Sequence, residues 1–211
     1  MWQVIVPVKG SDAGKSRLQV SPSLRARYAE AMAADTLGAV RACSLVREVV
    51  ALVASQPDRP VLYSADRLLV QPPGLQLNDA VTWALDTVPA DEETTGTAVV
   101  VADLPALRTS ELGRVLAEAE VHDLSIVADR HGSGTTLVAA GAGSLLVTRF
   151  GPDSARRHVD AGATRLDERL AVEPIAGLRC DVDTVEDLVE ARSLGLGAAT
   201  QALEAGLSSP T

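Results

Sequence analysis

The chain opens with an almost uninterrupted apolar run, QVIVPV at residues 3–8, which leads into the polar loop KGSDAGKS at residues 9–16. An apolar run that does not alternate with polar residues is typical of a strand buried on both faces of a sheet. Beyond the loop, Ser21 and Pro22 stand where a helix cap and a first helical turn are expected. The apolar spacing continues to about residue 42, so the first unit is a strand, a loop and a long helix.

The same alternation of strands and helices continues along the chain. Further strands are predicted at residues 46–54, 61–64, 97–102, 124–128, 135–140, 145–148 and 178–182, and further helices at 78–87, 110–119, 154–161 and 184–194. Strands separated by helices need crossover connections, which build a mostly parallel sheet with helices on both faces. We therefore predict an α/β fold of three layers in a single domain, residues 1–211, with a frayed tail from about residue 206.

Composition excludes several classes of protein. The 211 residues carry 19 basic and 28 acidic side chains, a formal charge of −9, with two Trp, two Tyr and one Phe. An acidic chain with few aromatic side chains is a poor nucleic-acid binder. No apolar run reaches the roughly 20 residues of a membrane-spanning helix. The two cysteines, Cys43 and Cys180, lie far apart in sequence and are expected to be buried thiols in a reducing compartment, so we expect a cytoplasmic protein with no membrane partner.

The loop after the first strand concentrates the lysines. Lys9 and Lys15 are the only two lysines beside 17 arginines, and Arg17 follows closely. The loop nearly matches a phosphate-binding loop, but it has three residues between its first glycine and Gly-Lys-Ser where that motif needs four. A phosphate-loop NTPase or kinase stays an alternative, as does an ordinary solvated loop. The favoured interpretation is a cationic loop that surrounds a triphosphate.

Carboxylates follow two of the predicted strands. Asp103 ends the strand at 97–102, and Asp181 and Asp183 alternate on the last predicted strand, so they share a face. Like charges held close together favour a cation between them, which predicts a Mg²⁺ site. The alternative is that Asp103 and Asp183 cap the turns that follow them.

Two segments are rich in hydrogen-bond donors. The segment FGPDSARRH at residues 150–158 places glycine and serine at a predicted helix start, and RHGSGTT at residues 130–136 is a flexible polar loop. A helix N-terminus with a serine donor is a candidate anion site. A single His131 is more often a surface residue than a ligand.

Taken in order, these motifs resemble the 2-phospho-L-lactate/phosphoenolpyruvate guanylyltransferase family of deazaflavin (coenzyme F-420) biosynthesis. The matching segments are VPVK at 6–9 with GKSRL at 14–18, Leu77-Asn78 with Ala80, Asp103-Leu104-Pro105, Gly134-Thr135, FGPDS at 150–154 with His158, and DVDT at 181–184 with Asp187-Leu188.

The resemblance implies a nucleotidyltransferase fold that is Rossmann-like and similar to nucleotide-diphospho-sugar transferases. It implies transfer of GMP from GTP to a phosphorylated three-carbon acid, with release of pyrophosphate and hand-over of the product to the next transferase of the pathway. The acid is phosphoenolpyruvate by resemblance to bacterial members, with 2-phospho-L-lactate or 3-phosphoglycerate as alternatives. A protein that kept the fold without catalysis is a more remote alternative.

The resemblance also implies residue roles. Lys9, Lys15 and Arg17 would hold the triphosphate, and Asn78 would help to seat the nucleotide. Asp103 and Asp183, with Asp181, would bind Mg²⁺, and Lys15, Asp103 and Asp183 would be catalytic. The acceptor acid would be held by Thr135, Gly151 and Ser154.

Overall fold

A computed structural model describes residues 1–8, 18–55, 64–91, 93–170 and 174–208 of the chain. Its sheet has seven strands in the order β3-β2-β1-β4-β6-β5-β7. The strands are β1 (Trp2–Val8), β2 (Val46–Val53), β3 (Arg67–Val70), β4 (Gly96–Val100), β5 (Ser125–Ala128), β6 (Thr135–Gly141) and β7 (Thr164–Arg165). The helices are α1 (Pro22–Arg41), α2 (Leu77–Thr87), α3 (Thr109–Ala119), α4 (Ser154–Asp160), α5 (Leu166–Arg169), α6 (Ala176–Arg179), α7 (Val185–Leu194) and α8 (Ala198–Ser208).

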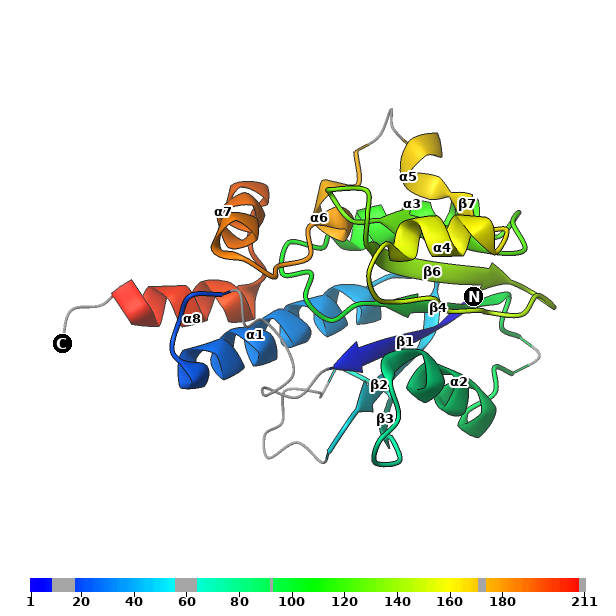
Figure 1. The fold of residues 1–211 in the computed structure, drawn as a ribbon, viewed down its shortest axis with the longest axis horizontal. Helices are drawn as coiled ribbons and strands as arrows, with labels where there is room; N and C mark the ends of the chain where they lie inside the picture. The colour runs from blue at the N-terminus through cyan, green and yellow to red at the C-terminus, as the bar shows by residue number, and fades with distance from the viewer. Residues whose placement is uncertain (9–17, 56–63, 92, 171–173, 209–211) are drawn as a thin grey trace.

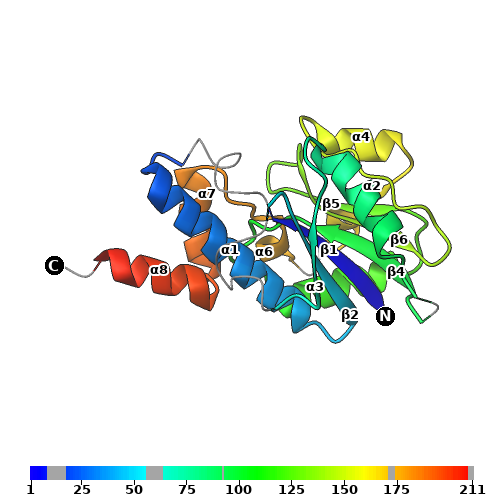
Figure 2. The same ribbon diagram turned by 90° about the horizontal axis from the view of Figure 1, so that it is seen from below.

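Helices cover both faces of the sheet, as the sequence predicts. On β1, Val4 and Val6 belong to one buried apolar cluster and Ile5 to the other, because successive side chains of a strand point to opposite faces. Helices α1 and α3 contribute to the first cluster, and α2 and α4 contribute to the second (Figure 2). The three-layer α/β prediction is confirmed.

The sheet is mostly parallel, with one reversed strand. β1 runs parallel to β2 and β4, whereas β6 pairs antiparallel with both β4 and β5. The amino end of β6 therefore lies at the edge where β1 and β4 end. In Figure 1 the arrow of β1 points toward this edge, on the side of the molecule where α6 and α7 lie.

Most predicted elements are confirmed to within a few residues, and the local signals explain why. The Ser21 hydroxyl accepts a hydrogen bond from the Leu24 N–H at the start of α1, and Pro22 occupies the first turn. Both cysteines are buried free thiols, as expected. None of the helices in the described ranges is long and apolar enough to cross a membrane.

Two predicted strands are wrong. Residues 145–148 are not a strand, because β6 already pairs with β4 and β5 and leaves no free edge beside it. Residues 178–182 begin within the short helix α6, where the buried carboxylate of Glu111 accepts hydrogen bonds from the N–H groups of Gly177 and Leu178 at 3.1 Å each. A tertiary contact therefore overrides the strand propensity of this segment.

The third strand differs as well. The prediction at 61–64 falls mostly on residues outside the described ranges, and the strand that follows β2 is β3 at Arg67–Val70. β7 and α5 were missed because they have two and four residues, too short for a periodic signal.

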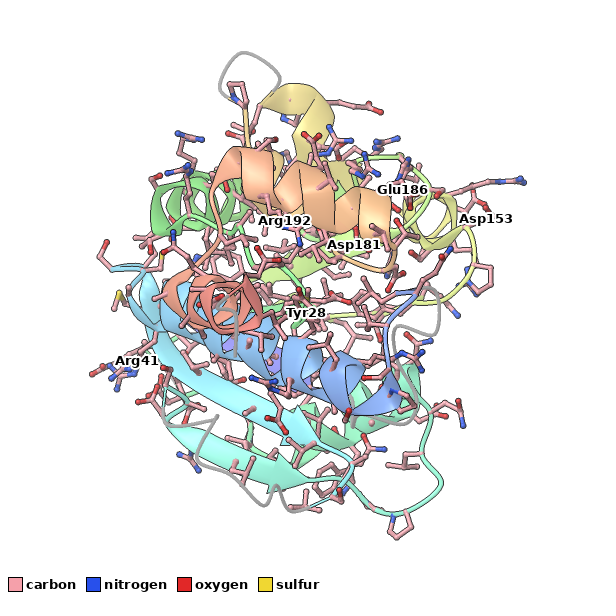
Figure 3. The ribbon with its side chains drawn as sticks, turned by 90° about the vertical axis from the view of Figure 1, so that its left-hand side faces the viewer. Tyr28, Arg41, Asp153, Asp181, Glu186 and Arg192 are labelled. Carbon is pink, nitrogen blue, oxygen red and sulfur yellow. The ribbon has the colours of Figure 1, made fainter. Side chains whose placement is uncertain are left out.

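The C-terminal helix α8 was also missed. The Asp35 carboxylate of α1 accepts hydrogen bonds from the N–H groups of Ala199 and Thr200, at 2.8 and 2.9 Å, so a side chain from a distant helix caps α8. Arg192 of α7 and Tyr28 of α1 both donate hydrogen bonds to the Glu204 carboxylate of α8. Figure 3 shows Arg192 and Tyr28 where these three helices meet. α8 continues to Ser208, past residue 206, where the predicted tail begins.

Candidate functional site

Predicted site residues that lie within the described ranges meet at one edge of the sheet. Asp103 follows β4, and Thr135 begins the antiparallel strand β6 beside it, where the Val101 N–H donates to the Thr136 carbonyl at 3.0 Å. In open α/β sheets ligands bind beyond the carboxyl ends of the strands, which is this edge. A shallow surface pocket beside Thr95 and Gly141 lies at the opposite edge and holds none of the predicted site residues.

The two acidic segments are joined through their backbones. The Val182 N–H donates to the Asp103 carbonyl at 3.0 Å, which brings the segment 181–183 against the end of β4. Burial raises the pKa of Asp181 to about 7, and the charges of Asp103, Asp183 and Asp129 act in the same direction. Figure 3, which looks onto this end of the molecule, shows Asp181 below α7. The structure therefore brings the three predicted carboxylates within electrostatic range of one another.

We call Asp103, Asp181 and Asp183 the acidic edge. This cluster of carboxylates suits a cation that also binds a substrate. Within the described ranges, no three or more His, Cys, Asp or Glu side chains are grouped closely enough to hold a metal ion by themselves. Mg²⁺ commonly uses one or two carboxylates and completes its coordination with water and substrate phosphates. Burial is the main cause of the raised pKa of Asp181, and such a cation would relieve both the cost of burying this charge and its repulsion by Asp103 and Asp183. Asp103, Asp181 and Asp183 thus fit a site that is completed by a nucleotide.

Asp187, which the sequence analysis named only in a segment that resembles the family, holds the acidic segment in place. Its carboxylate accepts hydrogen bonds from the Thr184 N–H and hydroxyl, both at 2.8 Å, and from the Asp183 N–H at 3.1 Å. Arg130 donates to the same carboxylate at 2.6 and 3.0 Å. Although burial raises the pKa of Asp187, these bonds from Thr184 and Arg130 outweigh it and lower the pKa to about 2. The capping box was visible in the sequence, but the Arg130 contact was not.

Asp129 shapes the polar loop that precedes Thr135. Its carboxylate accepts hydrogen bonds from the N–H groups of Ser133 and Gly134, at 3.0 and 2.8 Å. A Cβ at Gly134 would lie 2.5 Å from the Asp129 carboxylate, so a side chain at that position would displace it. The predicted donor-rich loop is therefore a tight turn around one carboxylate, and Asp129 is a site residue that the sequence pattern missed.

The segment 150–154 has an unusual backbone. Gly151 has φ +122°, and a Cβ there would lie 2.8 Å from the guanidinium of Arg157. Asp153 is left-handed with φ 52°, and Ser154 starts α4. α4 has only seven residues, so the hydroxyl of Ser154 and the guanidinium of Arg157 carry the anion-binding argument rather than the helix dipole.

The two hydroxyl groups predicted to bind the acceptor are in direct contact. Ser154 Oγ donates to Thr135 Oγ1 at 3.0 Å, although the two residues come from α4 and β6. Both side chains are largely buried. We call Thr135 and Ser154 the hydroxyl pair. The structure brings the two residues together, and their role stays a prediction.

Asn78 is bonded to the backbone of Phe150, and its expected role with the nucleotide stays a prediction. Its amide nitrogen donates to the Phe150 carbonyl at 3.1 Å, and its amide oxygen accepts from the Phe150 N–H at 2.8 Å. Both ends of the side chain are therefore engaged with the backbone next to Gly151. Lys9, Lys15 and Arg17 lie outside the described residues, directly after the end of β1.

Comparison with known proteins identifies the family. The family model described as "Guanylyl transferase CofC like" matches residues 2–204 of the chain. A protein of Thermomonospora curvata named phosphoenolpyruvate guanylyltransferase is 40% identical over 207 residues, covering 97% of this chain and 89% of the relative. A protein of Streptomyces avermitilis with the same name is 38% identical over 213 residues, covering 99% of this chain and 96% of the relative.

Solved structures agree on the fold. A protein from Desulfovibrio desulfuricans G20, described as a nucleotide-diphospho-sugar transferase, superposes with a TM-score of 0.69 at 19% identity and covers 97% of this chain and 94% of its own. The 4-diphosphocytidyl-2C-methyl-D-erythritol synthase of Anaerococcus prevotii gives a TM-score of 0.56 at 11% identity, with coverage of 92% and 95%. The acidic edge, the hydroxyl pair and the full-length matches lead to one assignment: the chain belongs to the family of CofC-like guanylyl transferases.

Proposed function

We propose that this protein transfers GMP from GTP to phosphoenolpyruvate, forming enolpyruvoyl-diphospho-guanosine and pyrophosphate in coenzyme F-420 biosynthesis. The observation that carries the proposal is the meeting of the acidic edge with the hydroxyl pair at one edge of the sheet, in a chain whose relatives bear that name. One end of the site suits a metal-bound phosphate chain, and the other offers neutral donors to a small anion.

The acidic edge would hold Mg²⁺ through Asp103, Asp181 and Asp183. The ion, when bound, neutralises charge on the α-phosphate and on the leaving pyrophosphate. Lys9, Lys15 and Arg17 would surround the triphosphate from the loop after β1. The part of this chain in the reaction is to place two anionic substrates in line despite their mutual repulsion.

The hydroxyl pair, with Gly151, would hold the acceptor acid. A phosphate oxygen of the acid is already anionic at neutral pH, so its attack on the α-phosphorus needs no general base. Burial lowers the pKa of His158, the imidazole nearest to the hydroxyl pair, to about 4, and its Nε2 already accepts a hydrogen bond from the Arg149 N–H. His158 is therefore unsuited to take a proton from the substrate.

The reaction is tested by pyrophosphate release in assays that contain Mg²⁺, GTP and one acid at a time. Phosphoenolpyruvate is expected to give the highest kcat/KM, with 2-phospho-L-lactate and 3-phosphoglycerate as comparison acids. Release that does not depend on any acid would instead favour an NTPase. Coupling to the next transferase of the pathway gives an independent readout.

Nucleotide choice and metal dependence are tested in the same assay. GTP is expected to outcompete ATP, and equal use of both would contradict the guanylyl assignment while leaving nucleotidyl transfer intact. A chelator is expected to abolish turnover, and added Mg²⁺ is expected to restore it. Lys15→Ala should lower kcat/KM for GTP, because its charge is assigned to the triphosphate.

A further inference from the structure

His158 makes contacts that neither metal binding nor general-base catalysis accounts for. Its side chain is fully buried on α4, with the ring edge-on to Phe150 at a centroid distance of 5.6 Å. Nε2 accepts a hydrogen bond from the Arg149 N–H at 2.7 Å, and Nδ1 lies 3.1 Å from Thr135 Oγ1. One imidazole therefore links the backbone before Gly151 to the hydroxyl pair.

The direction of each hydrogen bond follows from counting hydrogens. A neutral imidazole has one N–H group, and Nε2 is occupied as an acceptor, so the hydrogen sits on Nδ1, which faces Thr135 Oγ1. Burial lowers the pKa of His158 to about 4 and outweighs a hydrogen bond to the Ser154 backbone, which raises the pKa, while the charges of Arg157 and Arg149 lower it further, so the ring is neutral at pH 7. The Ser154 backbone is thus a second acceptor beside Thr135 Oγ1 for the ring hydrogen.

Thr135 Oγ1 then has both of its acceptor positions filled. It accepts from Ser154 Oγ and from His158 Nδ1, at 3.0 and 3.1 Å. A hydroxyl oxygen has two lone pairs and one hydrogen, so the hydrogen of Thr135 must point away from both neighbours. Thr135 opens β6 at the edge where the strands β1 and β4 end, which is where the acceptor acid is expected.

We propose that His158 is a positioning residue that turns the Thr135 hydroxyl into a fixed hydrogen-bond donor to an anionic oxygen of the acceptor acid. The proposal rests on the proposed function, because it needs an anionic acceptor at the hydroxyl pair. It predicts that His158 acts on the acid only, and only through Thr135. An imidazole that merely filled space beside Phe150 would affect both substrates or neither.

Two substitutions of His158 test the hydrogen bonds of its two ring nitrogens one at a time. In His158→Gln the side-chain amide reaches the Nε2 position and can still accept from Arg149, but it no longer donates to Thr135. In His158→Asn the amide reaches the Nδ1 position and can donate to Thr135, but it loses Arg149. We expect His158→Gln to lower kcat/KM for phosphoenolpyruvate about tenfold, with kcat/KM for GTP changed less than about twofold, and His158→Asn to recover most of that loss.

A double-mutant cycle tests the route through Thr135. Thr135→Val removes the hydroxyl, so adding His158→Gln to it should cause no further loss of kcat/KM for phosphoenolpyruvate. Additive losses would overturn the proposal, as would a His158→Gln variant with wild-type kinetics for the acid. The matched control is His122→Gln, which replaces a half-buried histidine at the opposite edge of the sheet. It should leave kcat/KM for both substrates unchanged.

The tautomer is measured independently of activity. In the protein labelled with ¹⁵N-histidine, His158 is expected to show the Nδ1–H tautomer and to stay neutral from pH 7 down to about pH 5. An Nε2–H tautomer or a charged ring would overturn the proposal. If the wild-type protein releases no pyrophosphate with any acid, the proposed function fails first and the inference fails with it. A wild-type enzyme that is active while His158→Gln is unimpaired rejects the inference alone.

Discussion

The acidic edge and the hydroxyl pair lie at the same edge of the sheet, yet their electrostatics are opposite. At the acidic edge, burial and three neighbouring carboxylates raise the pKa of Asp181 to about 7. At the hydroxyl pair, Thr135, Ser154 and His158 are all buried, and each polar atom has a defined hydrogen-bond partner. The carboxylates of the acidic edge repel one another, whereas the side chains around the hydroxyl pair are joined by hydrogen bonds.

This difference indicates how the site divides its work. A repulsive cluster gains most from a ligand that brings positive charge, so the acidic edge is suited to a cation that arrives with a phosphate chain. A satisfied network has little to reorganise when a ligand binds, so the hydroxyl pair is suited to orienting a small anion. Substitutions in the two regions should therefore have different signatures.

Asp103→Asn tests the acidic edge and has the largest expected effect. If Asp103 holds the cation as proposed, its replacement should lower kcat about a hundredfold or more, because several kcal/mol of charge stabilisation are lost. The melting temperature should change by less than about 4 °C, since the amide keeps the shape of the side chain. Asp123→Asn, an exposed residue of the opposite edge, is the control. Normal turnover in Asp103→Asn would remove Asp103 from the site.

The pH dependence of stability tests the buried, neutral state of His158. Its pKa is about 4 in the folded protein and 6.5 ordinarily, so the unfolded chain takes up a proton first as the pH falls. The contribution of His158 to the free energy of unfolding should be constant above pH 6.5 and should decrease by up to about 3 kcal/mol between pH 6.5 and 4.

That decrease is measured as a difference between two proteins. Denaturant unfolding of wild type and His158→Gln at several pH values isolates the contribution of His158, because the opposite trend expected from Asp181 is common to both. The free energy of unfolding of wild type, minus that of His158→Gln, should fall as the pH drops from 6.5 to 4. Parallel curves would show that His158 titrates normally in the folded protein.

Ser154→Ala tests whether the hydroxyl pair serves the acid. Ser154 Oγ gives its one hydrogen to Thr135 Oγ1, so the variant loses a bond that orients the Thr135 donor, and kcat/KM for phosphoenolpyruvate should fall about tenfold. kcat/KM for GTP should change much less. Ser144→Ala, at the opposite edge, is the control. If Ser154→Ala impairs GTP and spares the acid, the two substrate sites are assigned in reverse.

Asn78→Ala separates two roles for this side chain and has the smallest expected effect. If its two hydrogen bonds to Phe150 position Gly151 and Ser154, kcat/KM for the acid should fall about fivefold to tenfold, since each neutral bond contributes about 0.5–1.5 kcal/mol. A loss confined to GTP would support direct contact with the nucleotide instead. Thr82→Ala, exposed on the same helix, is the control.

Elements that are stabilised by residues close in sequence were predicted correctly, and elements that depend on residues far away in sequence were not. The buried strand β1 and the helix α1 could be predicted because their signals, an apolar run and a cap with proline, lie within a few residues. The helix α6 and the start of α8 depend on Glu111 and Asp35, carboxylates far away in sequence, so no local pattern could reveal them. The same holds for the site, where Asp129 and Arg130 act through the fold.

Apolar periodicity and ordered motifs are local properties of the chain, so the α/β class, the strand ends that carry Asp103 and Thr135, and the family could be predicted from the sequence. The fold alone sets the antiparallel direction of β6, which brings Thr135 to the edge where Asp103 lies. It also decided that both ends of Asn78 bond Phe150 and that His158 joins the backbone at Arg149 to the hydroxyl pair. The physical reason is that the direction of a buried hydrogen bond depends on every partner around it, and those partners come from separate strands and helices that only folding brings together.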